Sequence, residues 1–375
     1  MKIGIITITP QNNYGGAMQA YALQRVLQSM GHDAYVLIKR KQFFKPKPSS
    51  TLFVALKNLF IKYILGKNLI SIFIGKRLRL EYNFTHQHYI QFLDENIKQF
   101  SYDDYSDIPA DEFDALVVGS DQVWRATYFK GKISAMYFDF AKGWNVKRYA
   151  YAASFGKDDV SEYSPKQLQQ CADLAKLFDA ISVREDSGVD LCREHLGVNA
   201  EHLLDPTILL SKEDYTALIT NEPQQTGILN AYILDHNSDA TQLIDRCCRE
   251  LNLKQQYKII KRYRPSLIYS NLDEYVIPSP YKWLAEFRDA EFVVTDSFHG
   301  AVFSIIFNKP FVVMVNHKRG AARIHSLLKI FGLEDRLIER ADDLNTAHFA
   351  PIDYERVNRI KAEWQQRSFD FLKQL

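Results

Sequence analysis

Short apolar runs alternate with longer segments of helical periodicity along most of the chain. The first unit has a strand over residues 3–8, a polar loop with glycines over 9–16, a helix over 17–30 and a second strand over 34–38. Buried strands separated by helices are typical of α/β proteins with parallel sheets. Further strands of this first series are predicted at 115–118, 148–153, 180–183 and 202–204.

A second series of the same kind begins near residue 211. Its predicted strands cover 227–234, 257–260, 292–294 and 311–315, and its helices cover 240–251, 281–288 and 323–331. A chain of 375 residues also exceeds what one ordinary hydrophobic core holds, so two domains are expected.

The predicted fold class is α/β, with two Rossmann-like domains that face each other across a cleft. We expect an N-terminal domain over 1–210 that carries a helical insertion at about 40–100. A C-terminal domain should cover 211–350, followed by a helix over 351–375 that could pack back onto the N-terminal domain. In such sheets, ligands bind beyond the carboxyl ends of the strands.

The composition is that of a soluble globular protein, with 46% hydrophobic and 25% charged residues. The chain starts directly with a strand pattern, so we expect no signal peptide and a cytoplasmic location. Four cysteines have neither zinc spacing nor a disulfide layout, and we interpret them as buried thiols in a reducing compartment. They are Cys171, Cys192, Cys247 and Cys248.

The charges are unevenly distributed, because eleven basic residues gather in segment 39–79 and no acidic residue lies between Asp33 and Glu81. The rest of the chain carries 36 basic against 45 acidic side chains. Apolar clusters interrupted by lysines make this segment a poor transmembrane helix and a fair surface-lying one. Two alternatives stay open: an insertion that packs on its own domain, and contact with an anionic membrane surface. Nucleic acid is not expected as a partner, since no nucleic-acid motif accompanies the charge.

The loop after the first strand ends in four residues that could approach a ligand. They are Asn13, Tyr14, Gly15 and Gly16. The glycines permit close approach of the backbone, and the following helix start can accept negative charge. The loop has neither a dinucleotide fingerprint nor a P-loop, so a long βα turn without a ligand is the alternative.

A second strand end, after 115–118, carries Asp121, Gln122 and Trp124. Carboxylate and amide groups hydrogen-bond sugar hydroxyls, and an aromatic face can stack on a pyranose ring. We therefore interpret this cluster as a saccharide site, with a helix cap at Asp121 as the alternative.

A third strand end places Arg184 directly before Glu185 and Asp186. A guanidinium group can grip a carboxylate or a phosphate with two parallel hydrogen bonds. The alternative is that the two acids cap the following helix and pair with Arg184.

The fourth strand end is the turn that contains Ser297 and His299. Ser297 is the expected N-cap of a helix, so an imidazole and unpaired backbone N–H groups converge where an anion would bind. The next predicted strand, over 311–315, is followed by a cluster of cations: Lys318, Arg319 and Arg323. A proton donor beside an anion site is typical of a group-transfer enzyme.

Six short motifs occur in a specific order from about residue 3 to residue 340. They are Asn13-Tyr14-Gly15-Gly16, Gly119-Ser120-Asp121-Gln122-Val123-Trp124, Ala152-Ala153-Ser154-Phe155-Gly156, Ser182-Val183-Arg184-Glu185, Asp205-Pro206-Thr207 and Ser297-Phe298-His299-Gly300. In this combination and order, the chain resembles the polysaccharide pyruvyl transferase family.

The resemblance implies a fold similar to GT-B glycosyltransferases, phosphoenolpyruvate as donor and a lipid-linked or nucleotide-linked saccharide as acceptor in capsule or exopolysaccharide assembly. It also implies no metal and no cofactor besides phosphoenolpyruvate as co-substrate. Donor binding and catalysis in that family are linked to residues that match Arg184, His299 and one of Lys318 or Arg319. The basic segment 39–79 matches nothing in the family pattern, but it could hold the enzyme at the inner leaflet of the plasma membrane.

The resulting hypothesis assigns three groups of residues. His299 is the general acid that protonates the enol carbon of the donor, and Asp121 orients or deprotonates the acceptor hydroxyl. Arg184, Lys318, Arg319, Ser297 and Arg323 would bind the donor, and Asn13, Tyr14, Gly15, Gly16, Gln122 and Trp124 would bind the acceptor.

Two alternatives stay open. One is a GT-B-type glycosyltransferase that uses a nucleotide-sugar. The other is a non-catalytic, membrane-associated scaffold, which would have an occluded cleft or a His299 that points away from Arg184.

Overall fold

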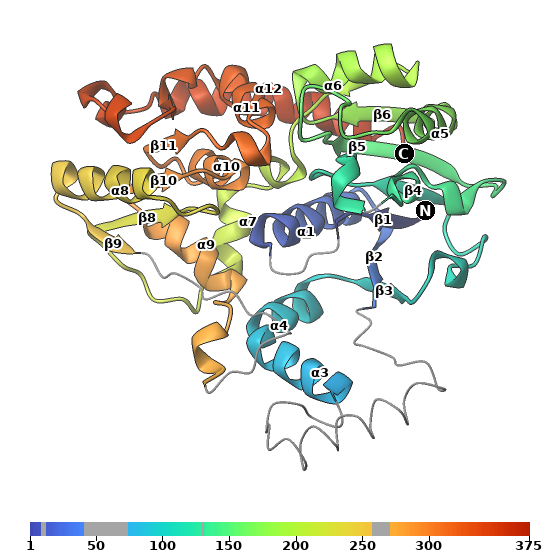
Figure 1. The fold of residues 1–375 in the computed structure, drawn as a ribbon, viewed down its shortest axis with the longest axis horizontal. Helices are drawn as coiled ribbons and strands as arrows, with labels where there is room; N and C mark the ends of the chain where they lie inside the picture. The colour runs from blue at the N-terminus through green and yellow to red at the C-terminus, as the bar shows by residue number, and fades with distance from the viewer. Residues whose placement is uncertain (9–12, 41–73, 130, 257–270) are drawn as a thin grey trace, which may run out of the picture.

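Two parallel β-sheets, each flanked by helices, form the body of the protein in a computed structural model (Figure 1). The structure describes residues 1–8, 13–40, 74–129, 131–256 and 271–375. The predicted strand at 257–260, part of the predicted loop 9–16 and most of the basic segment 39–79 therefore lie outside the described residues.

The first sheet has seven parallel strands in the order β3-β2-β1-β4-β5-β6-β7. Its strands are β1 (Lys2–Ile6), β2 (Asp33–Lys39), β3 (Gln99–Tyr102), β4 (Ala115–Val118), β5 (Lys147–Ala153), β6 (Ala180–Val183) and β7 (Glu201–His202). Strands β4 and β6 are apolar along most of their length because both faces of the sheet are covered. The strand order reverses between β1 and β4, which is the point where ligands bind in such sheets.

The second sheet has five parallel strands in the order β12-β11-β10-β8-β9. Its strands are β8 (Ile228–Tyr232), β9 (Lys254–Gln256), β10 (Phe292–Thr295), β11 (Phe311–Met314) and β12 (Leu337–Ile338). Here the order reverses between β8 and β10, so each sheet has a crevice beyond its carboxyl edge.

The main helices follow the strands as crossover connections. They are α1 (Tyr14–Ser29), α3 (Ile74–Thr85), α4 (Gln87–Asn96), α5 (Pro165–Ala175), α6 (Asp186–Leu191), α7 (Lys212–Leu218), α8 (Ser238–Leu251), α9 (Pro280–Asp289), α10 (Phe298–Ile306), α11 (Ala322–Phe331) and α12 (Tyr354–Leu372). Side-chain caps open several of them, including α5, α7, α8, α9 and α12. Neither α1 nor α10 has a side-chain cap, so their first N–H groups are not satisfied by their own N-cap residues.

One hydrophobic core joins the two halves, because side chains of α1, α9, α10, α11 and α12 pack in a single cluster. Helix α12 crosses from the C-terminal half to the N-terminal half (Figure 1). There Tyr149 donates its hydroxyl hydrogen to the Gln374 carbonyl, and Oγ of Ser368 accepts a hydrogen bond from the Leu204 amide. The last helix therefore ties the two sheets together.

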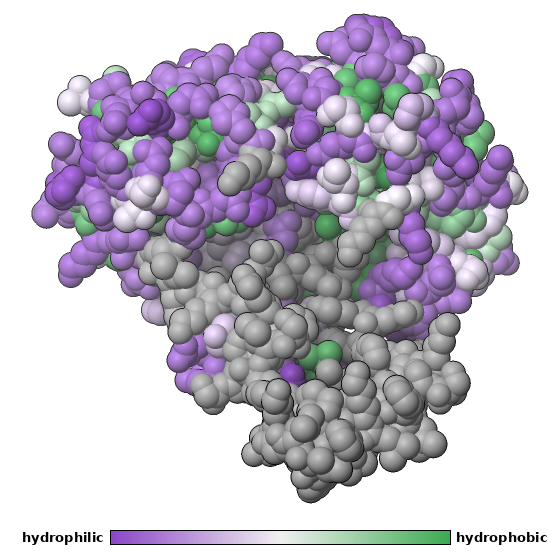
Figure 2. Space-filling view, viewed as in Figure 1, coloured by the Kyte–Doolittle hydropathy of each residue, from purple (hydrophilic) through white to green (hydrophobic). Residues whose placement is uncertain are grey.

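The structure confirms the predicted fold class and adjusts several boundaries. Helix α1 starts at Tyr14 rather than at residue 17, so two glycines of the predicted loop belong to the first helical turn. Strand β1 ends at Ile6, two residues before the predicted end. Among the described residues, no helix combines the length and the hydrophobicity needed to cross a bilayer. The described surface of both halves in Figure 2 is mostly hydrophilic, with apolar residues scattered over it.

Candidate functional site

A cavity of about 580 Å³ lies between the carboxyl edges of the two sheets. The N-terminal half contributes Asp121 and Gln122, which follow β4, and the first residues of α1. The C-terminal half contributes the ends of β8 and β10 and the start of α10. Both points of strand-order reversal therefore border the same cavity, as expected for a ligand site in α/β sheets.

His299 lies in the first turn of α10 and lines this cavity. A Cβ atom at Gly15 would overlap the His299 ring, so the imidazole packs directly against the first turn of α1. The residue is 5% exposed, and its Nε2 has no hydrogen-bond partner. Because His299 lines a cavity and its Nε2 faces the carboxylate that pairs with Arg184, the two features expected of the scaffold alternative, an occluded cleft and a His299 that points away from Arg184, are not seen at this residue.

The nearest charge to His299 belongs to Asp205, a residue to which the sequence hypothesis assigned no role. Its Oδ2 lies 3.7 Å from Nε2 of His299, an ion-pair distance that is too long for a hydrogen bond. Burial acts to raise the pKa of the Asp205 carboxyl, but His299, Arg184 and Thr207 hold that pKa well below its usual range. The only sequence signal was the position of Asp205-Pro206-Thr207 in the ordered set of motifs.

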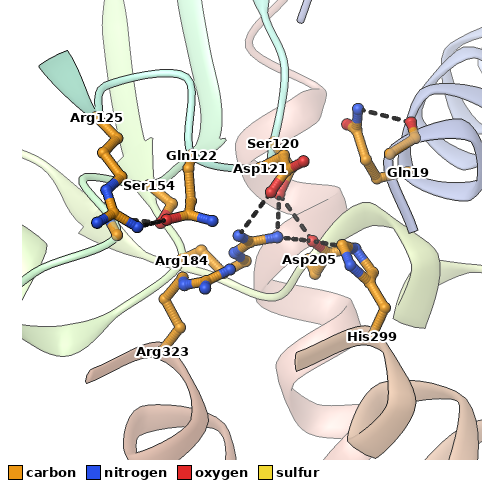
Figure 3. A network of polar contacts seen from close by, with 12 residues as sticks. Gln19, Ser120, Asp121, Gln122, Arg125, Ser154, Arg184, Asp205, His299 and Arg323 are labelled. Atoms are coloured by element: carbon orange, nitrogen blue, oxygen red, sulfur yellow. Dashed lines mark hydrogen bonds and ion pairs between the residues drawn. The ribbon is translucent and has the colours of Figure 1, made fainter. Parts of the chain in front are cut away.

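Arg184 lies behind the cavity wall. Its guanidinium pairs with Asp205 at 2.6 Å and with Asp121 at 3.5 Å (Figure 3). It also lies 4.2 Å from the ring centre of Phe298. Its side chain is 1% exposed and does not line the cavity. Burial acts to lower its pKa, yet the nearby carboxylates hold that pKa above the ordinary value. Direct donor binding, predicted for Arg184, does not fit this position, because the side chain is buried outside the cavity and its charge pairs with two carboxylates.

Asp121 lines the cavity at the end of β4, as the hypothesis requires of a group that touches the acceptor. Its φ of 75° lies in the left-handed region that side chains other than glycine rarely adopt. Such strain persists at positions that the surrounding structure holds firmly. One carboxylate oxygen accepts from Nδ2 of Asn13 at 3.3 Å, and the other faces Arg184. Gln122 also lines the cavity, with its Oε1 bound to Arg125 at 3.0 Å.

Trp124 does not belong to the site, and the predicted stacking on a sugar ring is wrong. Its indole is fully buried and stacks on Tyr137 with ring centroids 4.8 Å apart. Nε1 donates to the Met136 carbonyl at 3.2 Å, which satisfies the ring in the core. The side chain therefore anchors the loop that carries Asp121.

The first turn of α1 connects the two halves. The Tyr14 ring borders the cavity, stacks on Trp283 at 5.4 Å and donates its hydroxyl hydrogen to the Pro278 carbonyl. Gly16 packs against the Asn13 side chain rather than against the cavity. Of the residues predicted to bind the acceptor, Asn13, Tyr14 and Gln122 therefore line the cavity, whereas Gly15 contacts His299.

The predicted cations after β11 have different surroundings. Arg319 makes a bidentate ion pair with Asp235, through Nε at 2.7 Å and Nη2 at 3.0 Å. Arg323 lines the cavity and donates to the Arg319 carbonyl at 2.7 Å, but its Nε has no hydrogen-bond partner. Burial, followed by the nearby charge of Arg184, lowers the pKa of Arg323 to about 10. The side chain of Lys318 lies outside the described residues.

Ser297 is the N-cap residue of α10, as predicted, but its side chain makes no capping hydrogen bond. It lines the cavity beside His299, so the first-turn N–H groups of α10 lack a side-chain partner of their own. Helix N-termini of this kind favour negative charge. Among the described residues, no group of three or more His, Cys, Asp or Glu side chains is arranged to hold a metal ion.

Close contact between the backbones of the two halves borders the same region. A Cβ atom at Gly320 would overlap the carbonyl oxygen of Gly156, and φ at Gly320 is 88°. Nη1 of Arg125 also reaches the Arg319 carbonyl across this contact at 3.4 Å. The loop after β11 is thus held against the N-terminal half.

Solved structures with low sequence identity align with this chain over nearly its whole length. Arabidopsis thaliana UGT89C1 complexed with UDP-L-rhamnose aligns over 99% of this chain and 97% of that chain, with a TM-score of 0.51 and 8% identity. The glycotransferase of kitacinnamycin aligns over 100% and 98%, with a TM-score of 0.49 and 11% identity. At these identities the similarity concerns the fold alone. No curated protein matches the chain.

The family comparison is more specific, because the model for polysaccharide pyruvyl transferase matches residues 13–318. This range runs from the first turn of α1, through Asp121, Asp205 and His299, to the loop after β11. The chain belongs to the polysaccharide pyruvyl transferase family.

Proposed function

We propose that this protein transfers a pyruvyl group from phosphoenolpyruvate to a saccharide and forms a cyclic ketal during capsule or exopolysaccharide assembly. The observation that carries the proposal is the buried Nε2 of His299, which has no hydrogen-bond partner and belongs to a residue that lines the cavity beside an uncapped helix N-terminus. A proton donor and an anion site at one cavity suit a substrate with both a carboxylate and a phosphate.

The donor would bind at the C-terminal wall of the cavity. Arg323 supplies a cation, and Ser297 with the first N–H groups of α10 supplies hydrogen-bond donors. Arg319 lies next to them, although Asp235 already neutralises it. Lys318 is a further candidate, since it is adjacent to Arg319 in the sequence. The transfer needs no metal ion and no nucleotide cofactor in this proposal.

The reaction starts when His299 protonates the enol methylene carbon, which becomes a methyl group. The adjacent carbon is then electrophilic, and an acceptor hydroxyl attacks it while Asp121 accepts or orients the hydroxyl proton. The bond between this carbon and the phosphate oxygen breaks, and a second acceptor hydroxyl attacks the same carbon to close the ketal ring. In the balanced reaction, one hydroxyl proton ends in the methyl group and the other ends on the released inorganic phosphate.

The acceptor would bind on the N-terminal wall, near Asp121, Asn13 and Gln122. These carboxylate and amide groups suit hydroxyl recognition. Tyr128 and Tyr232 add aromatic surface to the same cavity and can take the stacking role that Trp124 does not have. A lipid-linked or nucleotide-linked saccharide is the expected acceptor class.

An assay of inorganic phosphate release tests the proposal. Purified protein is incubated with phosphoenolpyruvate and a panel of lipid-linked and nucleotide-linked saccharides, and the products are identified by mass spectrometry. We expect phosphate release that depends on the saccharide, with a pyruvate ketal as product. UDP release from UDP-sugars, without phosphate release from phosphoenolpyruvate, would instead identify a glycosyltransferase.

We also propose that the basic segment 39–79 contacts an anionic membrane surface. The described end of this segment includes Lys76, Arg77 and Arg79 in α3, where Leu80 is 56% exposed. Flotation with liposomes measures this contact. We expect salt-sensitive binding to vesicles that contain anionic lipid and none to neutral vesicles; equal recovery with both would contradict the proposal.

A further inference from the structure

We propose that Asp205 and Arg184 form a positioning pair that holds the His299 imidazole in place for proton transfer. The inference rests on the proposed function, because it explains how the general acid is prepared. It gives Asp205 a role, and it moves Arg184 from donor binding to support of the acid.

The Asp205 carboxylate is fixed on both oxygens. Oδ1 accepts from the amide of Thr207 at 3.0 Å and from its hydroxyl at 2.6 Å. Oδ2 accepts from Nη1 of Arg184 at 2.6 Å and from Oγ of Ser120 at 2.8 Å. The same Oδ2 faces Nε2 of His299 at 3.7 Å. A carboxylate with this many fixed partners cannot rotate away from the imidazole.

Arg184 is held equally firmly. Its guanidinium lies between Asp205 and Asp121, and its cation lies over the ring of Phe298, the residue immediately before His299. Its backbone is bound as well, since its amide donates to Ala153 and its carbonyl contacts Nε2 of His202. Arg184 therefore touches both the carboxylate that faces the imidazole and the start of the helix that carries it (Figure 3).

The charge around His299 comes from several elements. Asp205 is ionised at neutral pH because its polar contacts hold its pKa well below the usual range. An ionised carboxylate favours the charged form of a nearby imidazole, whereas the α10 N-terminus and neighbouring cations oppose it. The charged and titratable groups around this site are of two kinds. Those behind the cavity wall are Asp205, Arg184 and Glu185. Those that line the cavity with His299 are Asp121, Asp235, Asp296, Arg319, Arg323, His86, Tyr14, Tyr128, Tyr232 and Tyr275. Removal of the Asp205 charge leaves the opposing cations in place.

Two roles of Arg184 make different kinetic predictions. A residue that binds the donor affects the KM for phosphoenolpyruvate, whereas a residue that positions the acid affects kcat and the pH profile. The side chain of Arg184 is 1% exposed and carries two carboxylate partners, which leaves little of its charge for a ligand.

The test compares Asp205→Asn and Arg184→Lys with the wild-type enzyme, by kcat, by KM for phosphoenolpyruvate and by pH profile. Asp190→Asn is the matched control, because Asp190 pairs with Arg193 on the exposed surface. For Asp205→Asn we expect kcat to fall about 10- to 100-fold with little change in KM. The alkaline fall of activity should move to lower pH, because the general acid loses its proton more easily. Arg184→Lys should show a smaller loss in kcat.

A rise in KM with unchanged kcat in Arg184→Lys would overturn the proposal in favour of donor binding. An unchanged pH profile in Asp205→Asn would overturn it as well. If Asp205→Asn does not fold, Asp205→Glu tests the geometry, since it keeps the charge and changes its distance from the imidazole; unchanged kcat would contradict positioning.

An NMR titration of the His299 ring separates this inference from the proposed function. Its titration midpoint should move to lower pH in Asp205→Asn, whether or not the protein acts on phosphoenolpyruvate. Absence of phosphate release by the wild-type protein would overturn the proposed function only. An unchanged midpoint would overturn the positioning pair only.

Discussion

Arg184 and Arg323 are both buried arginines near His299, but they belong to opposite halves of the molecule and have opposite surroundings. Arg184, at the end of β6, pairs with two carboxylates, and they hold its pKa above the ordinary value against the effect of burial. Arg323, in α11, makes no ion pair with another described residue, and burial lowers its pKa to about 10. The charge of the first arginine is paired with two carboxylates behind the cavity, whereas the second lines the cavity with a charge that an anion would stabilise. Burial alone therefore does not identify a ligand-binding cation; the presence or absence of partners does.

Removal of the proposed acid, His299, should have the largest effect. His299→Gln keeps a polar side chain of similar size but cannot protonate the enol carbon. We expect kcat for phosphate release to fall about 1000-fold, in the range found for general acids. The thermal unfolding temperature should change little, and near-normal kcat would show that another group is the acid.

A smaller loss should follow when the contact between the halves is disturbed next to His299. Gly15→Ala places a methyl group where the imidazole lies, so the ring must move. Displacement of a catalytic group by about 1 Å can cost about 100-fold in rate. Gly4→Ala in β1 is the control, because its nearest neighbour is the Leu116 side chain at 3.0 Å, which does not line the cavity. Equal kcat values for the two variants would contradict the positioning of His299 by Gly15.

The substitution Arg323→Gln tests whether the arginine without an ion pair binds the donor. Loss of a charged hydrogen-bond donor at the donor site should raise the KM for phosphoenolpyruvate by about 10-fold or more. Arg319→Gln should raise it less, since Asp235 already neutralises Arg319. If Arg319→Gln had the larger effect, the donor would bind nearer to the β8 end of the cavity than proposed.

The smallest expected effect is on the free energy of unfolding, and it compares two carboxylates, Asp205 and Glu286. Asp205 is paired and has a lowered pKa, whereas burial raises the pKa of Glu286 in α9 to about 7. The folded state then binds more protons than the unfolded state between about pH 4.5 and about pH 7, so Glu286 costs stability as pH rises through this window. Glu286→Gln should raise the free energy of unfolding by about 1–3 kcal/mol near pH 8 and change it little near pH 4. A denaturant titration at both pH values measures the difference, and equal gains would contradict a raised pKa.

The fold could be predicted from the sequence because apolar strands and amphipathic helices alternate with clear boundaries. The turn at Ser297 and His299 was accessible for the same reason: polar residues that end a buried strand must lie at the edge of the sheet. The directions in which the side chains point could not be predicted from the sequence. Trp124 follows the same strand as Asp121, but its side chain is fully buried, whereas Asp121 and Gln122 line the cavity.

The network around Arg184 could not be predicted from the sequence either, because it depends on contacts between distant segments. Its two carboxylate partners come from the loop after β4 and from the turn after β7. Only the order of strands in the sheet brings these turns together beneath α10. No charge pattern in the sequence marks Asp205 as a site residue. Its proposed role rests on the folded structure, in which Arg184 and His299 lie on either side of its carboxylate.

Gly320 and Gly156 meet by main-chain atoms alone, so the distance between the halves at this point does not depend on side chains. Substitutions elsewhere around the cavity can change its shape and polarity without changing that distance. Under the proposed function, cavity-lining residues such as Tyr128 and Tyr275 can therefore be changed to alter the choice of acceptor while this main-chain contact is kept. The two glycines thus make the seat of the loop after β11 independent of the side chains that line the cavity.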